Sequence, residues 1–343
     1  MRKLPFSSDY MQGAHPAVLR RLAEENLTPC AGYGSDRFSE AAREKIRAAC
    51  GAPEAEIFFL TGGTQTNATV IGCMLQPWQG VVAADTGHVA VHEAGAIESG
   101  GHKVLTLPST DGKLSADTLE AFVKSFLGDE NREHMVAPGM VYLSQPTELG
   151  TLYSLAELRD IRRICREYNL RLYVDGARLA YALACPANDV TLRDLAENCD
   201  AFYIGGTKCG TLFGEAVVLP RKGAIPHFLT LIKQHGALLA KGFVAGLQFD
   251  ALFTGGLYKQ IGRNAVASAD RIRAALDEQG YEQAFPSPTN QIFPLLKEEQ
   301  YRRLSEKADL SFWERHADGR TVVRIATSWA TTEEDVGALI SIL

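Results

Sequence analysis

The feature that most limits how this chain can fold is a regular alternation of two kinds of segment between residues 56 and 220. Short apolar runs that end at turn residues are typical of β-strands, and they occur at 56–60, 81–85, 103–107, 140–144, 170–175, 201–205 and 215–220. Segments with helical spacing of apolar residues separate most of them, such as 115–127, 155–168 and 192–199. Near-continuous apolar strands indicate burial on both faces. The pattern therefore predicts an α/β fold, in which a mainly parallel sheet carries helices on both faces.

The pattern changes after Pro226. Residues 228–278 show long helical spacing that is interrupted at Gly255-Gly256. Strand candidates follow at 290–296 and 321–327, before a closing helix over 332–343. We therefore predict a large domain over residues 1–236, which includes an N-terminal arm, and a small α+β C-terminal domain over residues 237–343.

Composition and charge exclude several classes of function. The chain has 343 residues, of which 46% are hydrophobic, and its net charge of −6 comes without any block of like charges, so we expect no nucleic-acid partner. No run of about 18 apolar residues and no signal-peptide pattern occur, so we expect a cytoplasmic location and no membrane partner. The seven cysteines lack any C-x-x-C spacing, which favours reduced thiols and predicts no metal site.

A turn rich in glycine and hydroxyl residues, Thr61 to Asn67, follows the strand at 56–60. The helix that it opens has free N–H groups at its start, and these would hold an anion such as phosphate. The spacing is neither that of a P-loop nor that of a G-x-G-x-x-G fingerprint, so it specifies no nucleotide. Taken alone, the turn is also compatible with a purely structural role in which Thr64 caps the helix.

Two further strands end near a charged residue. Asp175 ends the strand at 170–175, where a carboxylate needs a cationic partner because its desolvation is costly. Lys208 follows the strand at 201–205 and is flanked by Gly205, Gly206 and Gly210, which let a bulky group approach the backbone. A lysine in such a place can act as an imine-forming amine. Taken alone, a lysine at such a place is more often one that extends from a strand end into solvent.

Together, these parts meet the needs of pyridoxal 5′-phosphate. The start of the helix would hold the phosphate, Lys208 would bond to the aldehyde, and Asp175 would pair with the pyridine N–H. His88 follows the strand at 81–85, where its flat imidazole would stack on the cofactor ring. A helix-capping or exposed histidine is the simpler alternative for His88.

With these residues in place, the chain resembles the low-specificity threonine aldolases, which belong to the β-eliminating lyase-like enzymes of fold type I. Six motifs in the same order carry the resemblance through nearly the whole chain. They are Ser8-Asp9, Tyr33-Gly34-Ser35-Asp36, Gly62-Gly63-Thr64, His88 with Glu93-Ala94-Gly95, Asp175-Gly176-Ala177-Arg178 followed by Lys208, and Arg324-Ile325-Ala326-Thr327.

The resemblance implies a fold type I, transferase-like architecture and assigns roles to individual residues. The substrate carboxylate would be held by Ser8, Arg178 and Arg324, with bidentate arginine geometry. The phosphate would be bound by Gly63, Thr64 and Gln65, and the remaining cofactor contacts would be His88, Asp175, Arg178 and Lys208. Tyr33 would enter the site from a neighbouring subunit, and Lys241 would reach the neighbour's phosphate. We therefore expect a homodimer or homotetramer with shared active sites.

The implied activity is the retro-aldol cleavage of a β-hydroxy-α-amino acid, such as L-threonine or L-allo-threonine, to glycine and an aldehyde. His88, His134 or a bound water would take the hydroxyl proton, and the sequence does not choose among them. His134 matches a family histidine near the substrate hydroxyl with an offset of one residue. Glu148 and Ser328 stand where several family members carry histidine, so the choice of substrate stays open.

Three alternatives remain. A β-eliminating lyase or an aminotransferase would share the phosphate turn, Asp175 and Lys208. A protein with the same fold could serve only as a binding or regulatory module. A nicotinamide-dependent oxidoreductase is disfavoured because the glycine fingerprint is missing.

Overall fold

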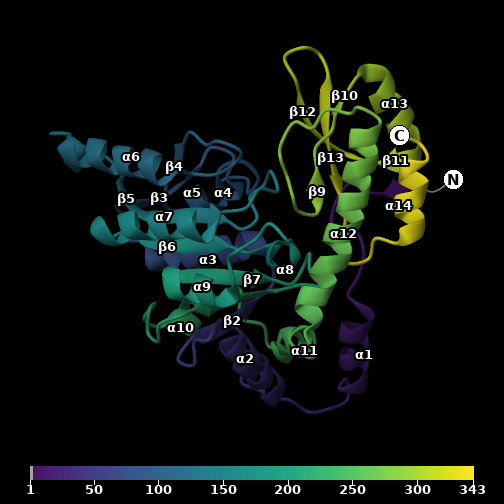
Figure 1. Cartoon of the computed structure of the whole chain (residues 1–343). Helices are drawn as coiled ribbons and strands as arrows, with labels where there is room; N and C mark the ends of the chain where they lie inside the picture. Colours follow the sequence, from purple (N-terminus) through teal and green to yellow (C-terminus); the bar gives the residue numbers. More distant parts are fainter. Residues whose placement is uncertain (1–2) are drawn as a thin grey trace.

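A seven-stranded sheet forms the centre of the molecule (Figure 1). The structure is a computed structural model that describes residues 3–343, so residues 1 and 2 of the predicted large domain lie outside the described residues. The strand order is β2 (Glu56–Leu60), β8 (Glu215–Leu219), β7 (Ala201–Gly205), β6 (Arg171–Asp175), β5 (Ala137–Ser144), β3 (Gln79–Ala84) and β4 (Val104–Leu107). The strands from β7 to β4 are parallel, whereas β8 runs antiparallel to β7 and β2, because the loop before it is too short for a crossover. The predicted mainly parallel sheet is confirmed.

Helices cover both faces of this sheet. One face packs on α2 (Arg37–Cys50), α6 (Ala116–Gly128), α7 (Leu155–Glu167), α8 (Leu179–Ala184) and α9 (Leu192–Asn198). The other face packs on α3 (Gly63–Met74), α4 (His88–Val91), α5 (Ala96–Ser99) and α10 (Phe228–Gln234). Because side chains alternate along a strand, Leu172 and Val174 of β6 enter the first core and Tyr173 enters the second. Burial on both faces explains why the strands are continuously apolar.

A smaller antiparallel sheet forms the second part of the molecule. Its strands are β10 (Leu295–Leu296), β13 (Thr321–Ala326) and β12 (Ser311–Arg315), and β9 (Gln291–Ile292) also pairs with β13. The helices α13 (Glu298–Lys307) and α14 (Glu333–Ile340) lie beside it, and buried residues of both share a core with the second half of α12 (Leu257–Glu278). Figure 1 shows α12 as a long helix that runs from the large sheet to the small one.

The helices α11 (Phe243–Leu252) and α12 connect the large and the small part of the molecule. The start of α12 packs on α8, and a Cβ at Gly262 would lie 2.0 Å from the carbonyl oxygen of Ala180, so only glycine fits there. The helix α11 packs on α2 and on α1 (Pro16–Glu24), which belong to the large part. The boundary at residue 236 falls between α10 and α11 and stays a prediction.

The N-terminal arm contacts the small part of the molecule before it joins the large part. The sequence assigned it to the large domain, but β1 (Leu4–Pro5) pairs with β11 (Ala308–Asp309) of the small part. The reason is apolar burial, because Phe6 is fully buried in the same core as Ile272 and Val323. The arm then returns to the large part at α1.

Two further properties of the described chain bear on function. Within residues 3–343, no helix is both long and apolar enough to cross a membrane. All seven cysteines are free, and five of them are buried. Burial raises the pKa of Cys50 to about 12, which leaves an unreactive thiol.

Candidate active site

The carboxyl ends of four parallel strands meet at one cavity. His88 begins the helix after β3, Ser144 ends β5, Asp175 ends β6, and Lys208 follows β7. The cavity is lined by these four residues together with Gly63, Glu93, Pro146, Glu148, Ala177, Arg178 and Tyr203. Ligands bind at this edge in open α/β sheets, so the predicted positions of His88, Asp175, Arg178 and Lys208 converge as expected.

Asp175 is a buried carboxylate held by neutral donors. Its Oδ2 accepts hydrogen bonds from the Tyr142 hydroxyl at 2.7 Å and from Asn67 Nδ2 at 3.0 Å, and its Oδ1 accepts from the N–H of Ala177 at 2.9 Å. Burial alone would raise the pKa of Asp175, but the nearby His88 and side-chain hydrogen bonds, among them those from Asn67 and Tyr142, outweigh burial and lower it. The group is therefore an ionised acceptor in the cavity at neutral pH.

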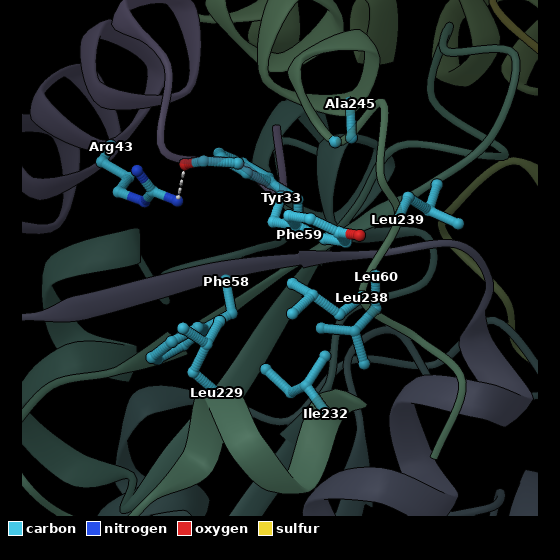
Figure 2. A pocket seen from close by; sticks show the side chains of 12 residues that line it. Tyr33, Arg43, Phe58, Phe59, Leu60, Leu229, Ile232, Leu238, Leu239 and Ala245 are labelled. Carbon is cyan, nitrogen blue, oxygen red and sulfur yellow. Dashed lines mark hydrogen bonds between the residues drawn. The ribbon is translucent and has the colours of Figure 1, made fainter. Parts of the chain in front are cut away.

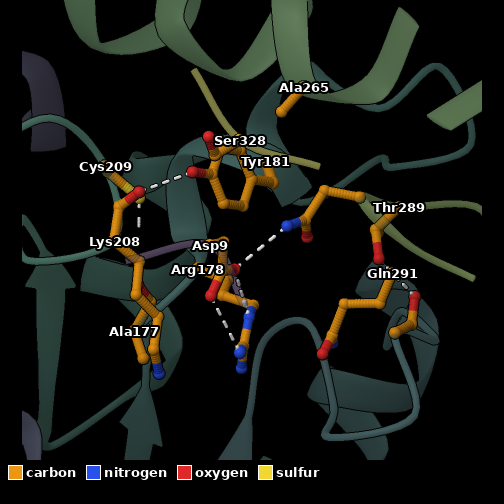
Figure 3. Close-up of polar contacts among 12 residues, drawn as sticks. Asp9, Ala177, Arg178, Tyr181, Lys208, Cys209, Ala265, Thr289, Gln291 and Ser328 are labelled. Atoms are coloured by element: carbon orange, nitrogen blue, oxygen red, sulfur yellow. Dashed lines mark hydrogen bonds and ion pairs between the residues drawn. The ribbon is translucent and has the colours of Figure 1, made fainter. Parts of the chain in front are cut away.

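Lys208 is half-buried in the loop between β7 and β8. Its carbonyl oxygen accepts a hydrogen bond of 2.5 Å from the Tyr181 hydroxyl, which fixes the backbone that carries the amine (Figure 3). Burial, and then the charge of Arg178, lower the pKa of Lys208. A lowered pKa increases the neutral fraction of the amine, and only the neutral amine is a nucleophile.

The predicted phosphate turn opens α3. Gly62 is the N-cap and has no side-chain hydrogen bond to the helix, so Thr64 does not cap it as the structural alternative required. The Gln65 side chain folds back, and its Oε1 accepts hydrogen bonds from the N–H and the hydroxyl of Thr61. The first backbone N–H groups of α3 therefore remain the available anion donors, and Gly63 lies on the cavity wall.

Asp9 organises Arg178 (Figure 3). Arg178 Nε donates to Asp9 Oδ2 at 2.7 Å, and Arg178 Nη2 donates to Asp9 Oδ1 at 3.1 Å. Asn290 Nδ2 also donates to Asp9 Oδ2, at 3.0 Å. Burial would raise the pKa of Asp9, but Arg178 outweighs burial and lowers it to about 2. The bidentate contact of Arg178 through Nε and Nη2 is therefore made to Asp9. Only the outer side of the guanidinium, which carries Nη1, remains for a substrate carboxylate.

Arg324 approaches the same place from β13. Its Nη2 donates to the carbonyl oxygen of Ser7 at 3.2 Å and its Nη1 donates to Gln291 Oε1 at 3.3 Å, whereas its buried Nε has no partner among residues 3–343. Burial, and then the charge of Arg178, lower the pKa of Arg324. Two guanidinium groups that repel each other, one with an unpaired donor, suit a bound anion. Ser8 lies between Ser7 and Asp9 on the arm that passes both arginines.

Two glutamates surround His88. Glu93 Oε1 lies 2.7 Å from the ring Nδ1 of His88. Glu148 Oε1 accepts the backbone N–H of His88 at 3.0 Å and the hydroxyl of Ser144 at 2.6 Å. Burial raises the pKa of Glu148. Neither glutamate was predicted as a site residue, although Glu93 lies in a quoted motif and Glu148 was singled out as a departure.

Seven predicted residues are not among those that line this cavity: Ser8, Tyr33, Thr64, Gln65, His134, Lys241 and Arg324. His134 is exposed in the 3₁₀ turn before β5. It therefore lies at the amino end of that strand, whereas the carboxyl end reaches the cavity, and it does not line the cavity of its own chain. Tyr33 and Lys241 are both exposed on a different surface. There the N–H of Tyr33 donates to the carbonyl oxygen of Ala240 at 3.1 Å. Ser328 is buried just after β13.

Tyr33 belongs to an apolar hollow on this second surface. Figure 2 shows it beside Phe58, Phe59, Leu238 and Leu239. The residue is 47% exposed and its φ is 60°, a left-handed conformation that a tyrosine rarely adopts. A strained, exposed aromatic residue is a feature of functional surfaces.

Known proteins resemble the chain over nearly its whole length. The β-eliminating lyase family model matches residues 6–299. The chain is 30% identical to the low specificity L-threonine aldolase of Pseudomonas aeruginosa over 97% of its own length and 95% of that protein. It is 28% identical to the enzyme of the same name from another Pseudomonas strain, over 97% of its own length and 95% of that protein.

Solved structures agree with these matches. A threonine aldolase of Leishmania major superposes with a TM-score of 0.95 at 41% identity, and the match covers 98% of both chains. A double mutant of the Thermus thermophilus aspartate aminotransferase superposes with a TM-score of 0.72 at 16% identity, over 99% of this chain and 90% of the other. The latter similarity concerns the fold alone.

Proposed function

The chain belongs to the β-eliminating lyase family, and on that premise we propose that it is a pyridoxal 5′-phosphate-dependent threonine aldolase. It splits β-hydroxy-α-amino acids of the L-threonine or L-allo-threonine type into glycine and an aldehyde. The observation that carries the proposal is the single cavity that holds Lys208, Asp175 and the start of α3 together. The predicted family, fold class and cofactor are confirmed, and the role of each site residue is our proposal.

The residues of the cavity fit pyridoxal phosphate. The uncapped N–H groups of α3 would hold the phosphate, and Lys208 would bond to the aldehyde carbon. Asp175 is ionised and buried, so it would hold a proton on the pyridine nitrogen. When bound, the cofactor supplies an electron-withdrawing ring that accepts the electron pair released from a broken bond at Cα.

The remaining side chains would orient the substrate. Arg324, through its unpaired Nε, and the outer side of Arg178 would hold the α-carboxylate, which fixes Cα near Lys208. His88 faces the cavity and His134 does not, so of the two histidines only His88 can meet the β-hydroxyl within one subunit. The proton acceptor is therefore His88 or a water that it holds.

Product analysis tests the reaction class. We expect the purified holoenzyme to release glycine and acetaldehyde from L-threonine, without ammonia or a 2-oxo acid. A panel of β-hydroxy-α-amino acids assayed for aldehyde then defines the substrate preference. Release of ammonia and a 2-oxo acid would instead identify a β-eliminating lyase, and amino transfer to an added 2-oxo acid would identify an aminotransferase.

Chemical trapping tests the assignment of Lys208. We expect borohydride reduction of the holoenzyme, followed by peptide mapping, to place a pyridoxyl group on Lys208, because this amine has a lowered pKa and lies in the cavity. The Lys208→Ala protein serves as the control and should carry no adduct. An adduct on another lysine of the native protein would contradict the assignment.

Replacement of Arg324 tests the carboxylate site. We expect Arg324→Ala to lower kcat/KM for L-threonine. The loss of transition-state stabilisation should be roughly 2–4 kcal/mol, because a charge-assisted contact to a desolvated carboxylate is lost. Arg315→Ala is the matched control, since Arg315 is an exposed arginine of the neighbouring strand β12. An unchanged kcat/KM for Arg324→Ala would remove this residue from the site.

We also propose that the enzyme is a homodimer or homotetramer with active sites shared between subunits. The support is the location of Tyr33 and Lys241, which lie together on an exposed surface and not in the cavity of their own chain. A second copy of the chain would cover the apolar hollow around Tyr33. The cytoplasmic location stays a prediction.

A further inference from the structure

Glu93 is a buried carboxylate with an unusual distribution of partners. The residue is 4% exposed and follows the short helix α4 that His88 begins. Its Oε1 contacts two groups, the His88 ring Nδ1 at 2.7 Å and Asn67 Nδ2 at 2.7 Å. Its Oε2 is buried and has no hydrogen-bond partner among residues 3–343. A bare carboxylate oxygen in the interior is costly, so this arrangement needs a physical reason.

The contacts determine which nitrogen of His88 carries the proton. An ionised carboxylate only accepts hydrogen bonds, so a ring nitrogen 2.7 Å from Glu93 Oε1 must be an N–H donor. In a neutral imidazole the other nitrogen then has a free lone pair. The contact therefore fits a His88 ring with the proton on Nδ1 and with Nε2 as an acceptor.

A second network holds Glu93 itself. The Tyr173 hydroxyl donates to Asn67 Oδ1 at 2.9 Å, which orients the amide so that Nδ2 points away from the tyrosine. Asn67 Nδ2 then donates both to Glu93 Oε1 and to Asp175 Oδ2. One amide therefore fixes the carboxylate beside His88 relative to the carboxylate that ends β6.

The unpartnered Oε2 of Glu93 indicates that the Glu93–His88 pair stabilises a positive charge on His88. When His88 takes a second proton on Nε2, its imidazolium charge offsets the charge of Glu93, including that of the unpartnered Oε2. Glu148 cannot replace this interaction, because it accepts the backbone N–H of His88 and not a ring nitrogen.

We propose that Glu93 is a positioning residue that fixes His88 in the Nδ1–H tautomer, so that Nε2 faces the cavity as the proton acceptor. The tautomer is a property of the protein alone, whereas the identity of the proton, that of the substrate β-hydroxyl, rests on the proposed function. As the O–H bond breaks, its proton forms the Nε2–H bond, the O–H electron pair forms the C=O bond of the aldehyde, and the Cα–Cβ bond breaks with its electron pair left on Cα, which then takes up a proton to give glycine. Cleavage releases this proton and consumes one at Cα of glycine, so the overall reaction is balanced.

Nitrogen NMR of histidine-labelled protein without cofactor tests the tautomer directly. The His88 signals are identified by their absence in His88→Asn. We expect a protonated Nδ1 and an unprotonated Nε2 in the native protein, and loss of that preference in Glu93→Ala. Glu98→Ala is the matched control, because Glu98 is an exposed glutamate of the same segment and its replacement should leave the His88 signals unchanged.

Kinetics of the holoenzyme provide the second measurement. We expect Glu93→Ala to lower kcat for L-threonine by at least about tenfold, with KM changed less than about threefold, because substrate binding does not involve Glu93. Glu93→Gln covers the case in which the alanine variant does not fold. Its amide oxygen can still accept from Nδ1, so we expect the native tautomer together with a reduced kcat, since a neutral amide does not stabilise the imidazolium.

The outcomes separate this proposal from the proposed function. A neutral His88 with its proton on Nε2 in the native protein, or an unchanged tautomer in Glu93→Ala, would overturn the positioning role of Glu93. A native kcat in Glu93→Gln would overturn the role of the charge. The expected tautomers in a protein that releases no aldehyde from any β-hydroxy-α-amino acid would support the positioning of His88 and contradict the aldolase.

Discussion

The Asp175→Asn enzyme is expected to bind pyridoxal phosphate and to lose kcat for L-threonine by about two to three orders of magnitude. The carboxylate of Asp175 is buried, and its pKa lies below the usual value although burial opposes this. It is therefore a fixed negative charge that would keep a proton on the pyridine nitrogen. A neutral amide of the same shape holds that proton far less well. The measurements are kcat and a cofactor titration by absorbance.

If Asp175 had only a structural role, Asp175→Asn would not show this loss of kcat. If the carboxylate only fixed the end of β6, the variant would lose thermal stability and keep its kcat. Asp200→Asn is the control for such a structural role. Asp200 is also buried beside the sheet, where its carboxylate pairs with Arg162 at 2.6 Å, and it does not line the cavity. We expect Asp200→Asn to lower the melting temperature and to leave kcat per folded enzyme unchanged. Asp175→Asn should instead lower kcat and leave the melting temperature nearly unchanged.

The large sheet could be predicted from the sequence because burial on both faces makes its strands visibly apolar. Other elements were missed. The strand β12 (Ser311–Arg315) has two charged residues and only partial burial, so it lacks an apolar pattern. The helix α2 was also missed, although Asp36 caps its start through hydrogen bonds to the N–H groups of Phe38 and Ser39 and Gly51 ends it in a left-handed conformation. These capping signals were present in the sequence.

The site was predictable to the extent that its residues follow strands directly. Asp175, Lys208 and His88 are of this kind, and all three reach the cavity. The residues that hold them in place were not found. Asn67 ends the turn that was predicted to bind an anion and Tyr142 lies in an apolar strand, so neither was linked to Asp175. Their role depends on contacts between elements distant in sequence, such as the 108-residue separation of Asn67 and Asp175.

Asp9 shows the same limit. Its partner Arg178 lies 169 residues away, and Asn290, which also contacts it, belongs to the small part of the molecule. The sequence motif named Ser8 and Arg178 as joint ligands of the substrate. The structure also pairs Arg178 with Asp9, so the arm orients the arginine by a buried ion pair between residues far apart in the sequence.

Mixing two inactive variants is expected to restore activity if Tyr33 acts across a subunit interface. Lys208→Ala should be inactive, and Tyr33→Phe should be strongly impaired in its homodimer. A mixed dimer has one site that combines the native Lys208 of one chain with the native Tyr33 of the other. With random exchange of equal amounts, about a quarter of all sites should then be native, so about a quarter of the native activity should appear.

The control uses two residues of the same cavity. Lys208→Ala mixed with Asp175→Asn should restore nothing, because both residues line one cavity of one chain and each site of a mixed dimer lacks one of them. Formation of mixed dimers is checked by native mass spectrometry. Mixed dimers of Lys208→Ala and Tyr33→Phe that stay inactive would exclude a role of Tyr33 in the partner's site. Its exposed ring and left-handed backbone would then reflect subunit packing alone, because the apolar hollow around it still needs a cover.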